Sequence, residues 1–564
     1  MKTALSLALL CALAAAPTWA AGQESSPEAF GESIDVRVVN VEAVVTDRQG
    51  ERVQGLTAAD FRLLVDGKEV PVEFFTEIAE GLSAPAPAGG QASPPSPAPE
   101  REVGRSFLVF LDESFSIAAY RDQVLRRLEA KLDLLEPRDR MAIVAFDGKR
   151  LETLSDWTGD RGALREAVAR AKARPSGGNR IISIRRSIAG DRALIRQAEM
   201  GLGTTGTAAL IDGAPFLDGR TAFLDEGDDI RMRVYLYPEM ERAIAAAAAT
   251  MRALPAPAGG RKVMLLLSGG WPFPEPQSLR NDPLRPFRPM SAGLALPEAE
   301  EMFAPLVATA NLLGYTLYPV EVHGSDPDSY AADASRVAPV STSSFLSSNW
   351  ELGVHSAMEH LAQETGGKAL LNSARLDALA RVDADTRSYY WLGFSPAWRA
   401  DDRRHEVRVE LRGPGLRVRS RTGFSDLSQK VETEMKTEGL LLFGGGAPEK
   451  QLLVELGTPR RSRFRTVEVP VTLLVPVESL TLLPTGEGQV AEVTLASGAL
   501  DGYGFRSDLP VVPLQLTVPG EPKPGGFARY ETTMKLRKAD HRLVFAIRDQ
   551  ATGEVLWGEA DFRP

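Results

Sequence analysis

Short apolar runs alternate with segments of helical periodicity between residues 106 and 394, and this alternation constrains the fold more than any other feature of the sequence. Strongly apolar runs are typical of strands covered on both faces, and regular strand–helix alternation favours a parallel sheet with helices on both sides. The apolar runs are Ser106–Leu111, Met141–Phe146, Val263–Leu267 and Thr316–Val322, and the helical segments are Tyr120–Leu135, Arg161–Ala173, Glu239–Leu254 and Glu298–Leu313. We therefore predict an α/β fold with a doubly wound, mostly parallel sheet over residues 106–397, completed by a last strand at Ser388–Phe394.

Two regions of different character precede this segment. Residues 34–80 contain short alternating runs, and Asp66-Gly67 between two of them is a strong hairpin-turn signal. We predict a small β module there. Residues 81–105 are rich in Pro, Ala, Gly and Ser and contain almost no large apolar residue, so they cannot build a core and are predicted to be a linker.

The strand–helix alternation stops after about residue 400. Charged, alternating segments on either side of Arg412–Gly415 predict a β-hairpin over residues 401–425, which would close the central module. Residues 450–564 contain only strand-like runs separated by turn residues, such as the turn at Asp549–Glu554. This pattern predicts a C-terminal β-sandwich.

Residues 1–20 have the pattern of a cleaved export signal. A positive start at Lys2 is followed by the apolar run Ala4–Ala16 and by small residues at Thr18 and Ala20. Cys11, the one cysteine of the chain, lies in this run, so the mature chain would contain no disulfide and no cysteine-bound metal. No later apolar run reaches the roughly 20 residues that a membrane span needs. We therefore expect a secreted or periplasmic protein without a transmembrane segment.

The overall charge argues against one class of partner. The formal net charge is -10, whereas nucleic-acid binding needs a basic surface. The local basic patch at Arg460–Arg465 is interpreted as a solvated strand face beside a turn. We therefore predict no nucleic-acid partner.

Oxygen-bearing side chains follow directly after the first apolar strand. Asp112, Ser114 and Ser116 form the pattern D-x-S-x-S. One carboxylate and two hydroxyls on one loop are hard ligands of the kind that Mg²⁺ prefers, and binding sites in parallel sheets lie beyond the carboxyl ends of the strands. The alternative interpretation is that these residues cap the following helix and orient the loop.

With these segments the chain resembles the von Willebrand factor A (VWA) domain and, more closely, the exported bacterial branch called VWFA-related proteins, common in Acidobacteria. The resemblance covers roughly residues 35–425, and its pieces are Gly55–Phe61 with Asp66-Gly67, Glu136–Asp147, Leu361–Gly367, Tyr389–Pro396 and Arg419–Phe424. It implies a Rossmann-like central domain and a metal site, called MIDAS, that grips an acidic residue of a partner protein.

This sequence departs from the family's metal site on two loops. The family has a threonine on a second loop where this chain has Asn179, within Pro175–Asn179, and Asn still offers one oxygen. The family has an aspartate on a third loop where this chain has Gly269, so one of two negative charges near the ion is missing. The resemblance therefore implies a degenerate Mg²⁺ site formed by Asp112, Ser114, Ser116 and Asn179, with weak or absent binding.

Three further residues have a spacing near that of a zinc motif. His355, Glu359 and His360 have the spacing H-x-x-x-E-H, which does not bring two imidazoles to one helix face as zinc enzymes require, so we interpret them as part of a surface helix. No nucleophile elbow, phosphate loop or dinucleotide fingerprint stands in a suitable context. We therefore predict that the protein is not an enzyme and has no cofactor other than this Mg²⁺ ion.

The expected function is adhesion or protein binding by an exported VWA-type protein, with a protein or cell-surface ligand held at the Asp112 corner. A long insertion at residues 174–237 interrupts the central domain, and it is interpreted either as a lid or contact surface beside that corner or as decoration without a role. One alternative is a metal-independent scaffold component of an envelope assembly, and a lower-ranked one is a secreted hydrolase. The sequence indicates neither the partner nor the oligomeric state.

Overall fold

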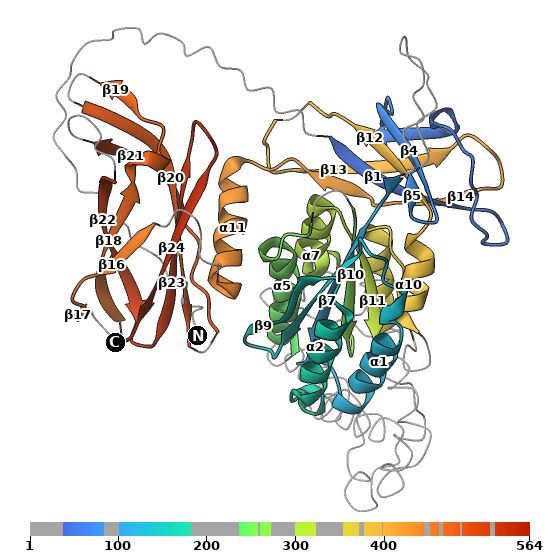
Figure 1. Ribbon diagram of the computed structural model, residues 1–564, viewed down its shortest axis with the longest axis horizontal. Helices are drawn as coiled ribbons and strands as arrows, with labels where there is room; N and C mark the ends of the chain where they lie inside the picture. The colour runs from blue at the N-terminus through green and yellow to red at the C-terminus, as the bar shows by residue number, and fades with distance from the viewer. Residues whose placement is uncertain are drawn as a thin grey trace, which may run out of the picture. The chain divides into compact units, whose positions relative to one another are not determined.

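The structure is a computed structural model in which the chain divides into two compact units (Figure 1). The larger unit holds Val39–Phe394 and Arg404–Ser425, and the smaller holds Ser395–Arg403 and Asp426–Pro564. The structure describes residues 38–83, 101–181, 236–257, 260–271, 299–322, 353–371, 377–397, 399–444, 452–461, 466–485, 488–502, 504–518 and 525–564. The predicted signal at 1–20, most of the linker at 81–105 and most of the insertion at 174–237 lie outside the described residues.

A five-stranded sheet at the centre of the larger unit contains the apolar runs. Its order is β11-β10-β7-β8-β9, with β7, β8, β10 and β11 parallel and β9 antiparallel to β8. The strands are β7 (Arg105–Asp112), β8 (Arg140–Phe146), β9 (Leu151–Thr158), β10 (Arg261–Ser268) and β11 (Tyr315–Glu321). Because every residue of β7 is buried, this strand needs cover on both faces.

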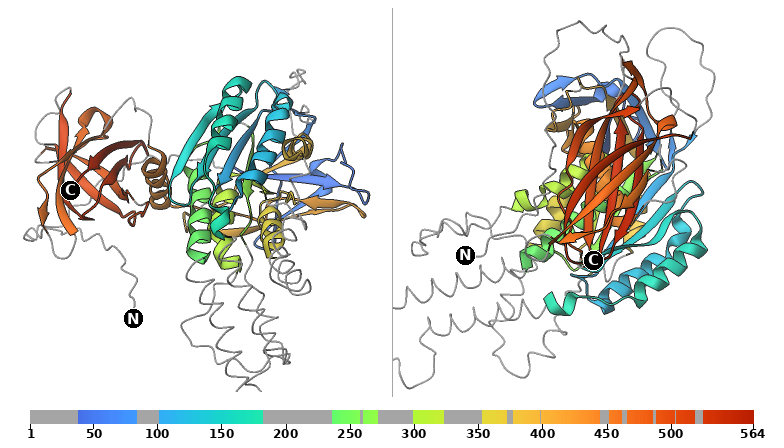
Figure 2. Two further views of the ribbon diagram at one scale, coloured as in Figure 1. Left: turned by 90° about the horizontal axis from the view of Figure 1, so that it is seen from below. Right: turned by 90° about the vertical axis from the view of Figure 1, so that its left-hand side faces the viewer.

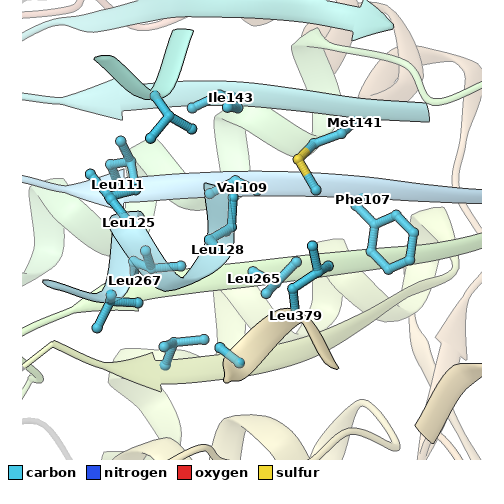
Figure 3. Packing of buried hydrophobic residues seen from close by; sticks show 14 of the residues in the cluster. Phe107, Val109, Leu111, Leu125, Leu128, Met141, Ile143, Leu265, Leu267 and Leu379 are labelled. Carbon is cyan, nitrogen blue, oxygen red and sulfur yellow. The ribbon is translucent and has the colours of Figure 1, made fainter. Parts of the chain in front are cut away.

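Helices supply that cover (Figure 2). They are α1 (Ala118–Ala130), α2 (Arg161–Ala173) and α10 (Ala378–Thr386) on one face, and α5 (Tyr237–Ala253) and α7 (Ala299–Leu313) on the other. On the first face, alternate β7 residues Phe107, Val109 and Leu111 pack against Leu125 and Leu128 of α1 (Figure 3). Each such buried side chain contributes roughly 1.5–3 kcal/mol relative to its exposed state.

The prediction that the chain is a doubly wound α/β protein is wrong. Of the described residues 43% lie in strands and 29% in helices, and they form five sheets that are mostly antiparallel. Among the named strands of the described residues, parallel pairing joins β7, β8, β10 and β11, and an isolated parallel bridge joins Val320 to Leu370. The prediction assigned the apolar strands of residues 106–397, including Ser388–Phe394, to one parallel sheet by their order alone.

The last predicted strand shows the physical reason. Residues Tyr389–Phe394 form β12, which pairs antiparallel with β1 (Val39–Thr46) and β4 (Phe74–Ala79) instead of joining the parallel sheet. A strand buried on both faces has the same apolar sequence whichever sheet holds it, so periodicity does not reveal its neighbours. β12 therefore belongs to a six-stranded sheet with the order β14-β1-β12-β4-β5-β6.

A four-stranded sheet packs against this six-stranded sheet through aromatic side chains. Phe61 lies 5.7 Å from Phe75 and 5.2 Å from Tyr390 between ring centroids. The sheet has the order β15-β13-β2-β3. The remaining strands of the two sheets are β2 (Phe61–Val65), β3 (Lys68–Val70), β5 (Leu82–Ser83), β6 (Arg101–Glu102), β13 (Arg404–Leu411), β14 (Arg417–Arg419) and β15 (Gly423–Ser425).

Two turn predictions have different outcomes in these sheets. The turn at Asp66-Gly67 is confirmed, because both residues have positive φ and join the paired strands β2 and β3. Within the segment 401–425, predicted to be a hairpin, β13 pairs antiparallel with β15, and the turn at Arg412–Gly415 joins β13 to β14. β13 also pairs with β2, and β14 pairs with β1.

In the smaller unit α11 (Gln429–Phe443) precedes the strands, and the short 3-10 helix η6 (Val477–Ser479) lies between β18 and β19. One sheet joins β16, β17, β18 and β22, and a second joins β19, β20, β21, β23 and β24. Their inner faces share one apolar core that includes Val471, Leu473 and Phe545. The strands are β16 (Leu453–Leu456), β17 (Arg460–Arg461), β18 (Thr466–Pro476), β19 (Leu483–Thr485), β20 (Gly488–Asp501), β21 (Val511–Val518), β22 (Phe527–Arg537), β23 (His541–Asp549) and β24 (Val555–Phe562).

The helices of the described residues are too short or too polar to cross a bilayer. None of them combines the length and the apolar character that a membrane-spanning helix needs.

Candidate functional site

The polar corner predicted from the sequence lies at the carboxyl end of β7, and Asp112 is its centre. The Asp112 side chain is 0% exposed, and both of its carboxylate oxygens accept hydrogen bonds. Oδ1 accepts from Ser114 Oγ at 2.6 Å and from the Phe115 backbone N at 3.3 Å. Oδ2 accepts from Ser268 Oγ at 2.7 Å and from Trp271 Nε1 at 2.9 Å.

The loop after Asp112 is fixed by its own backbone and by the neighbouring loop. Ser116 is buried, and its hydroxyl donates to the Asp112 backbone carbonyl. The backbone N of Gly177 donates to Glu113 O at 2.7 Å, and that of Gly178 donates to Ser116 O at 3.0 Å. The helix-capping alternative does not describe this arrangement, because Ile117 is the N-cap of α1 and no side chain caps it. The three polar side chains therefore order the loop.

An ion-pair cluster next to Asp112 holds the same loop from the side. Arg121 of α1 and Arg174 both bind Glu113 Oε1, at 3.4 Å and 2.8 Å. Arg121 also donates to the carbonyls of Lys172, Arg174 and Pro175. Burial raises the pKa of Glu113, and the two arginines oppose that rise by stabilising the carboxylate.

The second predicted loop reaches the corner with Gly177 and Gly178, and Asn179 beside them is exposed. A Cβ atom on Gly178 would lie 2.4 Å from the carbonyl oxygen of Ser116, so the backbones touch here. Asn179, the residue aligned with the family's threonine, is exposed, while Asp112, Ser114 and Ser116 are buried. Asp112, Ser114 and Ser116 therefore lie together on one buried loop.

The third loop contributes residues that the sequence analysis did not assign to the site. Ser268 ends β10 and Trp271 follows it, and both donate to Asp112 Oδ2. A Cβ atom on Gly269 would lie 2.0 Å from the Phe115 carbonyl oxygen. A hydroxyl at a strand end was a usable signal for Ser268. Nothing in the sequence pattern pointed to Trp271.

These contacts decide how well the residues fit a magnesium ion. Mg²⁺ needs an octahedral set of oxygen ligands, usually with one or two carboxylates. Here the single carboxylate accepts four donors, and one of them, the indole N–H of Trp271, can only donate. Burial raises the pKa of Asp112, although its hydrogen bonds from Ser114, Ser268 and Trp271 oppose the rise. The donor set does not match a Mg²⁺ site.

The histidines that had suggested zinc face different neighbours. His355 Nε2 lies 3.2 Å from Glu321 Oε1, at the carboxyl end of β11. His360 packs its ring against Phe303 with centroids 6.3 Å apart. The described contacts therefore do not join the two imidazoles around one position.

Comparison with known proteins gives only distant similarities. No protein-family model and no curated protein matches the chain. Among solved structures, the vWF domain of the type V pili tip protein Mfa5 from Porphyromonas gingivalis is 13% identical, with 50% of this chain and 94% of that chain covered and a TM-score of 0.24. The three N-terminal domains of the same protein are 11% identical, with 81% and 70% covered and a TM-score of 0.22. A putative beta-galactosidase from Bacteroides fragilis is 16% identical, with 20% of this chain and 16% of that chain covered and a TM-score of 0.15. TM-scores this low establish neither a shared fold nor a shared activity.

Proposed function

We propose that this chain is an exported, non-enzymatic binding or scaffold protein that holds a protein or cell-surface ligand without a metal ion at the Asp112 corner. The observation that carries the metal-independent form of this proposal is the closed set of hydrogen bonds on Asp112. Four protein donors occupy the two carboxylate oxygens of Asp112. A cation would need the same oxygens, so it could bind only if the corner opened and these hydrogen bonds broke.

The lack of space beside Gly269 also supports a partner-binding mode without a metal ion. The family's second aspartate would occupy this position, but its Cβ would overlap the Phe115 carbonyl oxygen at 2.0 Å. The loop that holds Asp112 therefore occupies the space that a side chain at position 269 would need. A partner would then bind through protein surfaces, and EDTA would leave the complex intact.

The burial of the two carboxylates at the corner supports a binding role over a catalytic one. An acid or base for catalysis must reach a substrate, whereas Asp112 is 0% exposed and Glu113 is 1% exposed. Both carboxylates are engaged by side chains of the same unit. Their polar contacts order loops at the end of the parallel sheet.

Calorimetric titration of the full chain with Mg²⁺ and with Mn²⁺ tests the metal-independent part. We expect no binding heat for the wild-type protein and none for Asp112→Asn, which keeps the shape of the side chain and removes its charge. Saturable heat in the wild type that disappears in Asp112→Asn would contradict the proposal.

Crosslinking of the immobilised full chain in an envelope extract, with and without EDTA, tests the binding part. We expect the same crosslinked partner in both conditions and no turnover of ester, peptide or glycoside substrates. A partner that is released by EDTA would favour metal-dependent adhesion, and turnover of any of these substrates would show that the protein is an enzyme.

A further inference from the structure

The strand β21 (Val511–Val518) forms one edge of its sheet in the smaller unit (Figure 1). β20 pairs with β21 on one side and with β19 and β23 on the other. Among the described residues, no strand pairs with the outer side of β21. The hydrogen-bonding ladder of this sheet therefore ends at β21.

One hydrogen bond shows which backbone groups of β21 face outward. Ser497 N donates to Pro510 O, so the backbone groups of Pro510 face β20. Because successive residues of a strand point these groups to opposite sides, those of the even-numbered residues face β20 and those of the odd-numbered residues face away from it. The outward groups belong to Val511, Pro513, Gln515 and Thr517. Pro513 has no N–H, and at a position that faces outward it removes no bond to β20.

β21 also lacks the charges that protect an exposed edge strand. Its sequence VVPLQLTV contains no charged residue. The edge strands β22 and β9 do carry charges, namely Arg529, Glu531, Lys535 and Arg537 in β22 and Glu152 and Asp156 in β9. Charged side chains on an edge strand are a common device against pairing with another chain. A strand added beside β21 would meet no charge on it.

The side chains of β21 that face the core lose cover toward one end of the strand. Leu516 and Val518 are 3% and 8% exposed and belong to the apolar core of the sandwich. Leu514 is half-buried, and Val512 is 38% exposed. These four residues point to the same face, because they are spaced two apart in a strand. The core face of this edge thus has apolar surface that an added strand would cover.

We propose that two copies of this chain associate by antiparallel pairing of their β21 strands across a twofold axis. This inference goes beyond the proposed ligand binding and does not depend on the Asp112 corner. Since only odd-numbered residues face outward, the pairing must place odd-numbered residues opposite each other. The register that uses the whole strand places Val511 opposite Thr517 of the second copy and Pro513 opposite Gln515.

This register makes the edge complementary to itself, and for this reason we take a second copy to be its partner. Each Val511–Thr517 pair would form two hydrogen bonds, and each Pro513–Gln515 pair would form one, because proline has no N–H. Leu514 would lie on the axis opposite its own copy, and Val512 would lie opposite Leu516 of the second copy. The apolar side chains that one copy leaves uncovered thus gain neighbours, through the same surface patch on both copies.

Sedimentation equilibrium of the full chain over a range of concentrations tests the proposal. We expect the mass to rise from that of one chain toward that of two, with a Kd in the micromolar range, because a single strand pair buries less area than a standard protein interface. A mass of one chain even at hundreds of micromolar would overturn the proposal and would leave the edge to an extended segment of another protein.

A proline variant assigns the dimer to this edge. Gln515→Pro removes an N–H that faces outward and keeps the bonds between β21 and β20, so we expect the Kd of the dimer to rise about 10- to 100-fold. Thr533→Pro is the matched control, because the bond from Val477 N to Gly526 O places the N–H of Thr533 on the free side of β22. We expect Thr533→Pro to leave the Kd unchanged. An unchanged Kd in Gln515→Pro would refute the interface.

Cysteine crosslinking tests the register and remains informative if Gln515→Pro fails to fold. In a Cys11→Ser background, which removes the one natural cysteine, Leu514→Cys places two thiols opposite each other on the axis. The Cα atoms of such a non-hydrogen-bonded pair lie about 4.5 Å apart, within the range of a disulfide. Val512→Cys is the control on the same face, because it is more exposed but would lie about 14 Å from its own copy.

We expect mild oxidation to link two chains of Leu514→Cys at least about tenfold faster than two chains of Val512→Cys. Equal rates, or a faster reaction of Val512→Cys, would contradict the proposed pairing.

Discussion

Alanine at Gly269 tests the close packing of the third loop against the loop that holds Asp112. A Cβ atom there would lie 2.0 Å from the Phe115 carbonyl oxygen and 3.7 Å from the Ser116 Cα. Carbon–oxygen contacts in folded proteins start near 3 Å, so one of two backbone segments must move by about 1 Å. Both segments are restrained, since Phe115 N donates to Asp112 and Gly270 N donates to Ser268 Oγ at 3.1 Å.

The loss of stability in Gly269→Ala can be estimated from substitutions that overpack a protein core. An extra methyl group in a tightly packed region costs typically about 1–3 kcal/mol, and a clash with backbone belongs at the upper end of that range. For a unit of this size, about 3 kcal/mol corresponds to a fall in Tm of roughly 4 °C. We therefore expect Gly269→Ala to unfold at a clearly lower temperature than the wild type.

Differential scanning calorimetry of the full chain measures this change, and Gly413→Ala is the matched control. At Gly413 a Cβ would meet nothing closer than 3.8 Å, so we expect a change within about 0.5 kcal/mol. Gly269→Asp adds the carboxylate of the family's metal site and should be at least as unstable as Gly269→Ala. An unchanged Tm in Gly269→Ala, or a Mg²⁺-dependent rise in Tm for Gly269→Asp, would refute the reasoning.

Three further substitutions probe the charged groups. Asp112→Ala leaves the donors of Ser268 and Trp271 without an acceptor, so it should lower the free energy of unfolding by about 3 kcal/mol. Asp112→Asn should lower it by about 1 kcal/mol. Equal losses for the two variants in chemical denaturation would contradict this prediction. Arg121→Met should destabilise by about 3 kcal/mol in the same assay, since it removes a partner of Glu113 and the donor to three carbonyls, and a change below about 1 kcal/mol would argue against it. Burial raises the pKa of Asp385, but Arg419 and Lys368 outweigh burial and bring it well below its usual range, so its ion pairs stabilise the fold above about pH 4 and are lost as the pH falls below that. Asp385→Asn should therefore flatten the loss of stability between about pH 4 and pH 2, and an acid limb as steep as that of the wild type would show that Asp385 is not responsible.

Several elements were predictable because their information is local. The helix predicted at Arg161–Ala173 is α2 with the same bounds, since apolar residues at helical spacing and Asp160 as N-cap define it without reference to the rest of the chain. The strand predicted at Ser106–Leu111 is β7 with one further residue at each end. The turn at Asp66-Gly67 depends only on the two residues that adopt positive φ.

The candidate site divides in the same way. The D-x-S-x-S pattern placed Asp112, Ser114 and Ser116 on one loop after a buried strand, and the structure brings these three together. The partners of Asp112 on the other side, Ser268 and Trp271, lie more than 150 positions away in the chain. No short-range pattern joins residues at that separation.

The sequence alone determined where strands such as β7 and helices such as α2 form and where the polar corner after β7 lies. The tertiary structure decided which strands pair, so that β12 joins β1 and β4 in an antiparallel sheet, and it decided that the Asp112 carboxylate is satisfied by hydrogen bonds. The physical reason is that periodicity records how many faces of a segment are buried, while the identity of the burying partner depends on distant residues that compete for the same surface.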